Sequence, residues 1–271
     1  MRILAMLLTA SLAMGLLARE PAVHPKYGPG VSVMARDNGY LRRVDAAPDF
    51  WSLVPFYVPQ FNDYSCSTAA VTMVVNGFLH PAGRTLADTE RNVTQVDLLA
   101  RVREIPWQEL VSPIGACGRH GLELAELAMV TKCSLDQYGL AGGCVEIVEF
   151  AVDDLAGLRQ VLARNEADAH DYLLAHFVQD ELTGARGGPY PHVSPVAAYD
   201  AATGRVLILD VDRDWYEPYW VSAEDLLRAL TRSTEQCGRG GLVRVEYGGG
   251  GRPGATAPRG PQVDTDAPVS Q

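Results

Sequence analysis

Cys66 lies in a stretch whose residue types suit nucleophilic catalysis. The stretch, YVPQFNDYSCSTAAVTMVVNG, places the thiol at the start of an apolar run that predicts a buried helix. A thiol in the first turn of a helix lies at the positive end of the helix dipole, which stabilises the thiolate. Upstream, Gln60 carries an amide that can donate to an oxyanion together with the backbone N–H of Cys66. A lone buried cysteine is more often a packing residue, so this stretch leaves both interpretations open.

His192 and Asp210 are the candidates for the base and the orienting acceptor that a cysteine nucleophile needs. His192 opens an apolar strand, and the turn DAATG leads to a second strand that ends with Asp210, which predicts a hairpin. If Tyr199 pairs with Arg205, His192 and Asp210 are diagonal neighbours on one face, within side-chain reach. A register shifted by one residue would send them to opposite faces. The alternative is a histidine near a turn and an aspartate at a strand end, with no joint role.

The remaining histidines and cysteines give weaker signals. No C-x-x-C pair or Cys/His cluster with zinc-ligand spacing occurs, so no metal site is expected. Four cysteines are able to form two disulfides in an exported protein, which would leave Cys66 free: Cys117, Cys133, Cys144 and Cys237. The other five histidines are expected to be surface or core residues: His24, His80, His120, His170 and His176.

Hydrophobic spacing predicts the helices and strands that must position these groups. Helices are predicted in the first part of the chain, over residues 65–77, 96–102, 122–130 and 152–165, with Asp153 or Asp154 starting the last. Strands are predicted in the second part, over residues 171–178, 192–199, 205–211 and 241–247. Helices followed by an antiparallel sheet indicate an α+β fold, with a cleft expected where the two halves meet.

Composition bounds the domain organisation and excludes some functions. The 271 residues are 47% hydrophobic and 21% charged, which is ordinary for a globular protein. A net charge of −10 argues against a basic face for nucleic acid or anionic membranes. Residues 50–247 have a globular pattern. Residues 19–49, rich in Pro and Gly, are expected to form an extended N-terminal arm, and residues 248–271 a disordered tail.

Residues 1–18 have the layout of a secretory signal peptide, with one arginine, an apolar run and small residues. Cleavage is expected after Gly15 or Ala18, and the mature protein is expected to be periplasmic or secreted, with no other transmembrane segment. An uncleaved membrane anchor is the alternative, because the apolar run is at the short end for a spanning helix.

Several motifs resemble the catalytic domain of the phytochelatin synthase family. HVSPVAAYDAATGRVLILDVDRDWYEPYWV resembles its second half, with an H-x-S-P motif, a D-V-x-R stretch and an aromatic-rich P-x-W-V. QFNDYSCSTAAVTMVVN resembles the nucleophile helix, while TQVDLL and GLELAELA resemble segments that follow it. The resemblance keeps its order from Phe50 to Leu230. It implies a papain-like fold and a phytochelatin synthase-like catalytic domain over residues 50–247.

The resemblance also implies an activity on glutathione or a related γ-glutamyl thiol peptide. In the family the cysteine attacks the peptide carbonyl before glycine, and γ-glutamylcysteine passes from a thioester to water or to a second glutathione. No cofactor is required, and heavy-metal ions enter as metal–glutathione substrate complexes. No cysteine-rich second domain follows in this sequence, so the short bacterial type, mainly a glutathione hydrolase, is expected. A homodimer is a possible assembly.

Carried over residue by residue, the resemblance implies Cys66 as nucleophile, His192 as base then acid, Asp210 as orienter and Gln60 in the oxyanion hole. Substrate contacts are predicted for a further set: Arg213, Ser67 and Tyr216. Three departures from the family pattern accompany these matches. Ser67 replaces a glycine, Pro191 follows a longer loop where the family has glycine, and Glu217 replaces a proline.

Two other functions use the same residues. A papain-like peptidase that trims leader or other small peptides would employ the same Gln, Cys, His and Asp, and would favour an open groove. A non-catalytic module that binds thiol peptides or metal would keep the scaffold without turnover.

Overall fold

The computed structural model describes residues 24–81, 87 and 91–247. The predicted signal peptide, residues 19–23 of the N-terminal arm and the predicted tail lie outside these residues. Within the described residues, no helix has the length and apolar character needed to cross a membrane.

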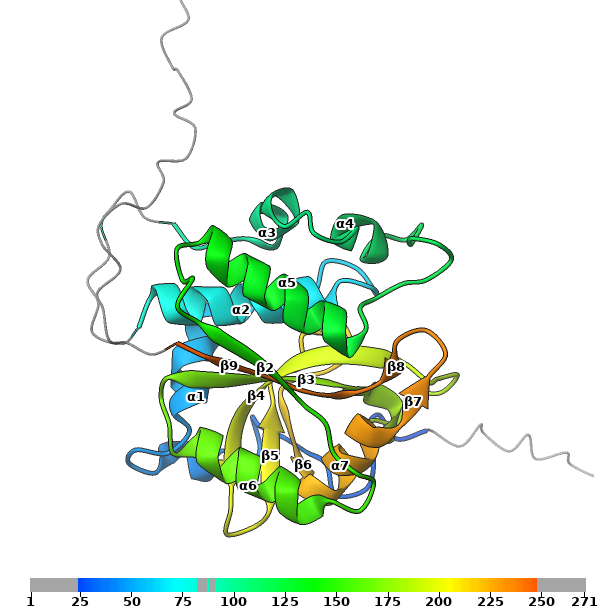
Figure 1. Cartoon of the computed structure of the whole chain (residues 1–271). Coiled ribbons are helices and arrows are strands. Elements are labelled where there is room, and N and C mark those ends of the chain that lie inside the picture. The colour runs from blue at the N-terminus through cyan, green and yellow to red at the C-terminus, as the bar shows by residue number, and fades with distance from the viewer. Residues whose placement is uncertain (1–23, 82–86, 88–90, 248–271) are drawn as a thin grey trace, which may run out of the picture.

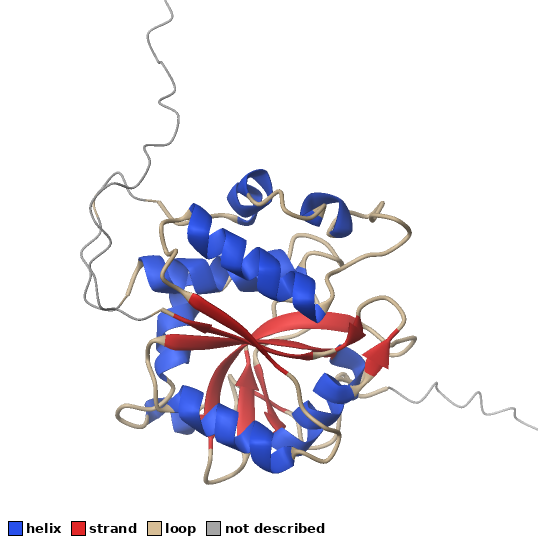
Figure 2. Ribbon diagram, viewed as in Figure 1, coloured by secondary structure: helices blue, strands red, loops and turns tan. Residues whose placement is uncertain are grey.

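A seven-stranded antiparallel sheet forms the centre of the molecule (Figures 1 and 2). Its strands lie in the order β1-β6-β5-β4-β3-β9-β2, so the N-terminal arm supplies one edge strand. A separate two-stranded hairpin pairs β7 with β8. The strands are β1 (Ser32–Val33), β2 (Cys144–Val148), β3 (Asp171–Val178), β4 (Pro191–Asp200), β5 (Arg205–Ile208), β6 (Tyr219–Ser222), β7 (Ser233–Thr234), β8 (Gly238–Arg239) and β9 (Gly241–Glu246).

Helices cover both faces of the sheet. Figure 1 shows α2 and α5 on one face, with α3 and α4 beyond them, and α6 and α7 on the other. The helices are α1 (Pro48–Leu53), α2 (Cys66–Leu79), α3 (Gln95–Arg101), α4 (Trp107–Leu110), α5 (Leu124–Gln137), α6 (Leu155–Glu166) and α7 (Ala223–Thr231), with short 3-10 helices η1 (Tyr40–Arg42), η2 (Val54–Phe56) and η3 (Gln179–Glu181).

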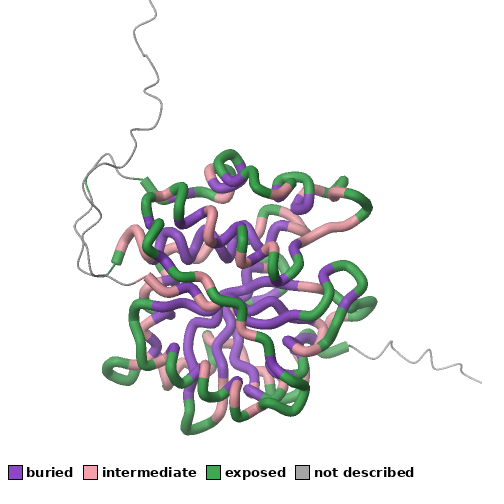
Figure 3. Tube along the Cα trace, viewed as in Figure 1, coloured by how far each residue is buried: buried purple, intermediate pink, exposed green. Residues whose placement is uncertain are grey.

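The central strands of the sheet are buried on both faces, as the purple tube in Figure 3 shows. Alternating side chains of β3 separate into two apolar cores: Leu174 packs with α2 and α5, and Leu173 packs with α6 and α7. This alternation follows from the two-residue period of a strand. The strand β3 therefore has a packed apolar layer on either side.

The α+β prediction is confirmed, although helices and strands are less segregated along the chain than expected. The strand β3 has the predicted bounds, and β4, β5 and β9 lie within a few residues of theirs. The sequence interpretation missed β2, β6 and α7. The strand β2 is an edge strand with mostly exposed side chains, so it lacks the apolar pattern of a buried strand.

The helix α2, which begins with Cys66, runs on to Leu79, past the stop predicted at Asn76 and Gly77. Both residues have tertiary roles instead. The Asn76 side chain exchanges two hydrogen bonds with the backbone of Val93, of 2.9 and 2.8 Å. A Cβ atom on Gly77 would lie 2.9 Å from the Tyr172 hydroxyl, so glycine allows the helix to approach β3. The Asn-Gly pair therefore marks close packing here.

The register of the β4–β5 hairpin differs from the predicted one at the turn. Tyr199 pairs with Val206, one residue away from the expected partner. A β-bulge then shifts the register between Val196 and Ala198, so that Val196 pairs with Ile208. One extra residue in β4 restores the predicted alignment at the far end of the hairpin, where the candidate catalytic residues lie.

Candidate active site

Cys66 is the first residue of α2, and its side chain is 7% exposed. The loop before it is held by Ser65, whose hydroxyl accepts hydrogen bonds from the backbone N–H groups of Phe61 and Asn62, at 2.9 and 3.0 Å. The Asn62 amide donates to the carbonyl of Val111 at 2.9 Å. The thiol is thus placed at the positive end of a 14-residue helix on a loop with little freedom to move.

His192 lies in β4 and Asp210 lies two residues after the end of β5. His192 Nε2 is 2.9 Å from Asp210 Oδ1, and the Cys66 side chain lies close enough to His192 to help raise the pKa of the imidazole. The Ser194 hydroxyl lies 3.0 Å from the same Nε2. Because Nε2 faces Asp210, Nδ1 is the ring nitrogen left for the thiol. The structure thus brings together the predicted nucleophile, base and orienting acceptor, Cys66, His192 and Asp210, which form a candidate catalytic relay.

The charges of His192 and Asp210 stabilise each other in a buried site. Burial opposes protonation of His192, but the charge of Asp210 and its hydrogen bond outweigh it, so the pKa of His192 is well above its usual value. Burial would raise the pKa of Asp210, but the charge of His192 outweighs it and this pKa is lowered. The imidazolium–carboxylate pair is therefore the favoured state.

Asp210 accepts hydrogen bonds from three other groups besides His192. Its Oδ2 accepts from the Tyr219 hydroxyl at 2.8 Å and from the Gln179 amide at 3.1 Å. The backbone N–H of Asp212 donates to Oδ1 at 2.9 Å. The sequence interpretation missed Tyr219 and Gln179. Their distance from Asp210 along the chain gives no local signal, and the aromatic-rich stretch around Tyr219 was the only available clue.

Gln60 begins the loop that leads to Cys66. Its backbone N–H donates to the carbonyl of Val211 at 2.9 Å, which ties this loop to the residue after Asp210. Gln60 Oε1 is buried and has no hydrogen-bond partner among the described residues. An oxyanion hole would use the N–H donors of this amide, and the backbone bond to Val211 keeps Gln60 beside Asp210. That role remains a prediction.

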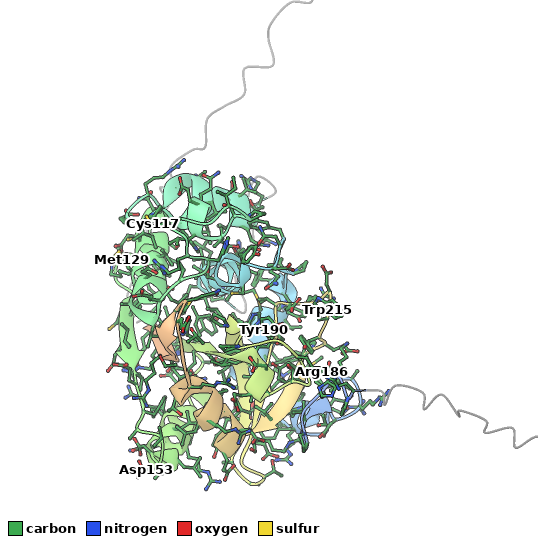
Figure 4. All side chains as sticks on the ribbon, turned by 90° about the vertical axis from the view of Figure 1, so that its right-hand side faces the viewer. Cys117, Met129, Asp153, Arg186, Tyr190 and Trp215 are labelled. Atoms are coloured by element: carbon green, nitrogen blue, oxygen red, sulfur yellow. The ribbon has the colours of Figure 1, made fainter. Side chains whose placement is uncertain are left out.

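The three predicted substrate-contact residues lie in different surroundings. The Arg213 guanidinium lies 4.7 Å from the ring centroid of Tyr57, whose hydroxyl donates to the Asp210 carbonyl. Arg213 therefore packs on the tyrosine that contacts Asp210, and its role as a substrate contact remains a prediction. Tyr216 lines a cleft of about 410 Å³, together with Lys26 and Trp215. The exposed side chain of Trp215 is labelled in Figure 4.

The position of Ser67 does not fit its predicted role as a substrate contact. The residue is 1% exposed, and its hydroxyl accepts a hydrogen bond from the Trp107 indole at 3.0 Å. The side chain belongs to the core between α2 and α4 and is not open to a ligand. A serine at the family's usual glycine position therefore provides a partner for a buried indole.

The four cysteines that were candidates for two disulfides do not form them. All five lie in the described residues and all are free thiols. Cys117 and Cys144 are exposed, and Cys237 is buried with its thiol 3.5 Å from the carbonyl of His120. Within residues 24–81, 87 and 91–247 no three His, Cys, Asp or Glu side chains are grouped to hold a metal ion.

A second histidine, His176, is buried near His192 but has a different chemistry. Burial lowers its pKa to about 4, and its Nε2 lies 2.9 Å from the Leu122 carbonyl. A neutral imidazole that donates to a backbone carbonyl is a core residue. His192 differs because a carboxylate faces it.

A nucleophilic thiol at the start of a helix, with its base and acceptor on an antiparallel sheet packed against that helix, defines the papain-like cysteine enzymes. The predicted papain-like fold is confirmed in this chain. Within that class the sequence matches phytochelatin synthase over residues 40–240, and the chain belongs to the phytochelatin synthase family.

Plant relatives extend well beyond the matched region. Glutathione gamma-glutamylcysteinyltransferase 1 of Lotus japonicus is 22% identical over 232 residues, which cover 85% of this chain and 41% of that protein. Glutathione gamma-glutamylcysteinyltransferase 3 of the same plant is 24% identical over 190 residues, 68% of this chain and 35% of that protein. The Arabidopsis thaliana enzyme 1 is 20% identical over 70% of this chain and 35% of its own length. The chain thus spans about two fifths or less of these relatives.

Proposed function

We propose that this chain cleaves glutathione before its glycine and transfers γ-glutamylcysteine to water or to a second glutathione. The arrangement of Cys66, His192 and Asp210 carries the proposal, because it places a nucleophile beside a base that is hydrogen-bonded to an orienting acceptor. The names of the plant relatives support glutathione as the substrate. A related γ-glutamyl thiol peptide would satisfy the same chemistry.

In the first half-reaction the Cys66 thiolate attacks the carbonyl carbon before glycine. The Gln60 amide and the backbone N–H of Cys66 stabilise the oxyanion that forms. The His192 imidazolium then donates its proton to the glycine nitrogen, the C–N bond breaks and glycine leaves. The product on the enzyme is a thioester between γ-glutamylcysteine and Cys66.

In the second half-reaction water or the amino group of a second glutathione attacks the thioester carbonyl. His192, now neutral, takes the proton of the attacking group, and the C–S bond breaks. The Cys66 thiolate and the imidazolium are restored. Asp210 keeps the imidazole in one orientation through both halves and stabilises its charged form.

Glycine release from glutathione tests the proposal. The unmodified chain should release glycine, Cys66→Ala should abolish the release, and Cys133→Ala should retain it. Cys133 is a matched control because it is a half-buried thiol on α5, outside the relay. Glycine release that persists in Cys66→Ala would contradict the proposal. Faster cleavage of longer peptides than of glutathione would favour a papain-like peptidase.

We propose that heavy-metal ions act through the substrate, as metal–glutathione thiolates. The preference of thiolates for soft metals supports this role. Cadmium should then change the transferase rate in proportion to the metal–glutathione complex present. If the rate instead follows the amount of metal that the protein itself binds when no glutathione is present, this proposal is wrong.

We also propose export, on the sequence of residues 1–18 alone. Expression of the full chain in a bacterium should give a periplasmic product whose N-terminus follows Gly15 or Ala18. An intact N-terminus in the membrane fraction would support the anchor alternative.

A further inference from the structure

We propose that Tyr219, held in place by the N-terminal arm, is a positioning residue for the catalytic carboxylate of Asp210. This inference rests on the proposed function, because it assigns a role within the Cys66–His192–Asp210 relay. Its first support is the hydrogen bond of 2.8 Å from the Tyr219 hydroxyl to Asp210 Oδ2. Both residues are fully buried, so water cannot replace this donor.

The Tyr219 hydroxyl can only donate in this position. Burial and the nearby charge of Asp210 raise its pKa well above the usual value, so the phenol keeps its proton. A permanent donor at Oδ2 leaves Oδ1 for the imidazole. The hydroxyl thus fixes which carboxylate oxygen faces His192, and with it the orientation of the ring.

The N-terminal arm fixes Tyr219 through the backbone. Val33 of β1 pairs with Tyr219 at the edge of the sheet. The next arm residue, Met34, donates its N–H to the carbonyl of Pro218 at 2.8 Å. The strand that carries Tyr219 is therefore held on one side by the arm and on the other by β5.

Tyr27 of the arm also fixes the ring of Tyr219. The Tyr27 ring centroid lies 5.7 Å from that of Tyr219 and 5.7 Å from that of Tyr216. The Tyr27 hydroxyl donates to the carboxylate of Glu217, and the backbone N–H of Glu217 donates back to it at 3.2 Å. Glu217 replaces the family's proline, so this departure anchors the arm.

The same arm segment holds the second donor to Asp210. Gly28 donates to the carbonyl of Leu182 at 3.2 Å, and the N–H of Leu182 in turn bonds the carbonyl of Gln179 at 3.0 Å. Both donors to Oδ2, Tyr219 and Gln179, are thus attached to arm residues that precede the family match at residue 40. The arm takes part in the catalytic geometry although it contains no residue of the relay.

The test compares Tyr219→Phe with Tyr40→Phe. The two substitutions are matched, because the Tyr40 hydroxyl also donates at 2.8 Å to a carboxylate, that of Glu166, away from the relay. The readout is the rate at which iodoacetamide alkylates Cys66 as a function of pH, measured by mass spectrometry on the peptide that contains it. Alkylation reports the thiolate–imidazolium pair and needs no glutathione.

Tyr219→Phe should move the acidic limb of this profile to higher pH by about one unit, because a misoriented Asp210 stabilises the pair less. It should also lower kcat for glycine release about tenfold with little change in KM. Tyr40→Phe should leave the profile at its wild-type position. Equal shifts in both variants, or none in Tyr219→Phe, would overturn the assignment of Tyr219.

Variants of the arm test the second part of the proposal and do not disturb the buried tyrosine. Tyr27→Ala removes the ring and should shift the alkylation profile in the same direction, by a smaller amount. Tyr27→Phe keeps the ring contacts and should shift it less than Tyr27→Ala. An unchanged profile in Tyr27→Ala would remove the arm from the proposal. If the unmodified chain fails to release glycine but its alkylation profile still depends on Tyr219, the proposed substrate is wrong and the positioning role stands.

Discussion

His192 and Asp210 lie on one face of the sheet, with Nε2 and Oδ1 at 2.9 Å, because β4 contains one extra residue between Val196 and Ala198. From the turn, the pairing of Tyr199 with Val206 would send the two side chains to opposite faces if it continued without interruption. The bulge corrects the alignment. A local irregularity of the strand thus creates the contact on which the proposed chemistry depends.

Asp210→Asn should lower glycine release by about 100-fold or more. The charge of Asp210 keeps the pKa of His192 above its usual value, and without it burial favours the neutral ring. The thiolate would lose its imidazolium partner at neutral pH. Single-turnover formation of the thioester across pH 5–9 measures this effect. An Asp210→Asn variant nearly as active as the unmodified chain would show that the carboxylate is not required.

Ser67→Ala should reduce stability without changing the KM for glutathione. The Trp107 indole would lose its buried acceptor, at a cost of about 1–3 kcal/mol in the free energy of unfolding. Urea denaturation and steady-state kinetics measure the two effects separately. A raised KM with unchanged stability would restore the predicted role of Ser67 in substrate binding.

Gly77→Ala should destabilise the protein by about 1–3 kcal/mol, although alanine is the better helix former. The added Cβ would meet the Tyr172 hydroxyl at 2.9 Å and a methyl group of Leu53 at 3.2 Å. Adding Tyr172→Phe to this variant should recover part of the loss, because it removes the closest contact. Thermal unfolding of the two variants measures this recovery. Additive losses would show that the hydroxyl is not the limiting contact.

Asp171 should make the protein less stable as pH rises. Burial raises its pKa to about 7, and neither of its buried oxygens has a hydrogen-bond partner among the described residues. The folded state therefore holds a proton that the unfolded state releases near pH 4. Between about pH 4 and 7 the free energy of unfolding should fall by roughly 1–3 kcal/mol, a range that allows for solvent screening.

Asp171→Asn isolates this effect from other titrating groups. The variant should be more stable than the unmodified chain at pH 8, and the difference should shrink at pH 5. Urea denaturation at the two pH values measures it. A difference that is larger at pH 5 would contradict the assignment.

The sequence predicted the residues of the relay because each carries a local signal. Cys66 begins an apolar helix, His192 begins a strand and Asp210 follows its hairpin partner. The predicted register was wrong at the turn, where Tyr199 pairs with Val206. The bulge further along β4 was not predicted, because a bulge inside an apolar strand changes no residue type that a pattern detects. His192 and Asp210 nevertheless lie on one face as predicted, because the one-residue difference at the turn and the bulge between Val196 and Ala198 cancel.

The supports of the relay were not predictable in the same way. Gln179 and Tyr219 reach Asp210, and Tyr27 reaches Tyr219, only through the three-dimensional packing of separate elements. Asn76 and Gly77 were misread because a helix stop and a close helix–strand contact favour the same residues. Local patterns pointed to the candidate reacting groups, whereas long-range packing determines how those side chains are held.

The covalent intermediate on Cys66 tests the proposed chemistry most directly. The unmodified chain should be mixed with glutathione, quenched at low pH within one turnover and mapped by mass spectrometry. A γ-glutamylcysteinyl adduct is expected on Cys66 and on none of the other four cysteines, and it should be absent in Cys66→Ala. Glycine release with no adduct on Cys66, or an adduct on another residue that turns over, would contradict a thioester mechanism at this site.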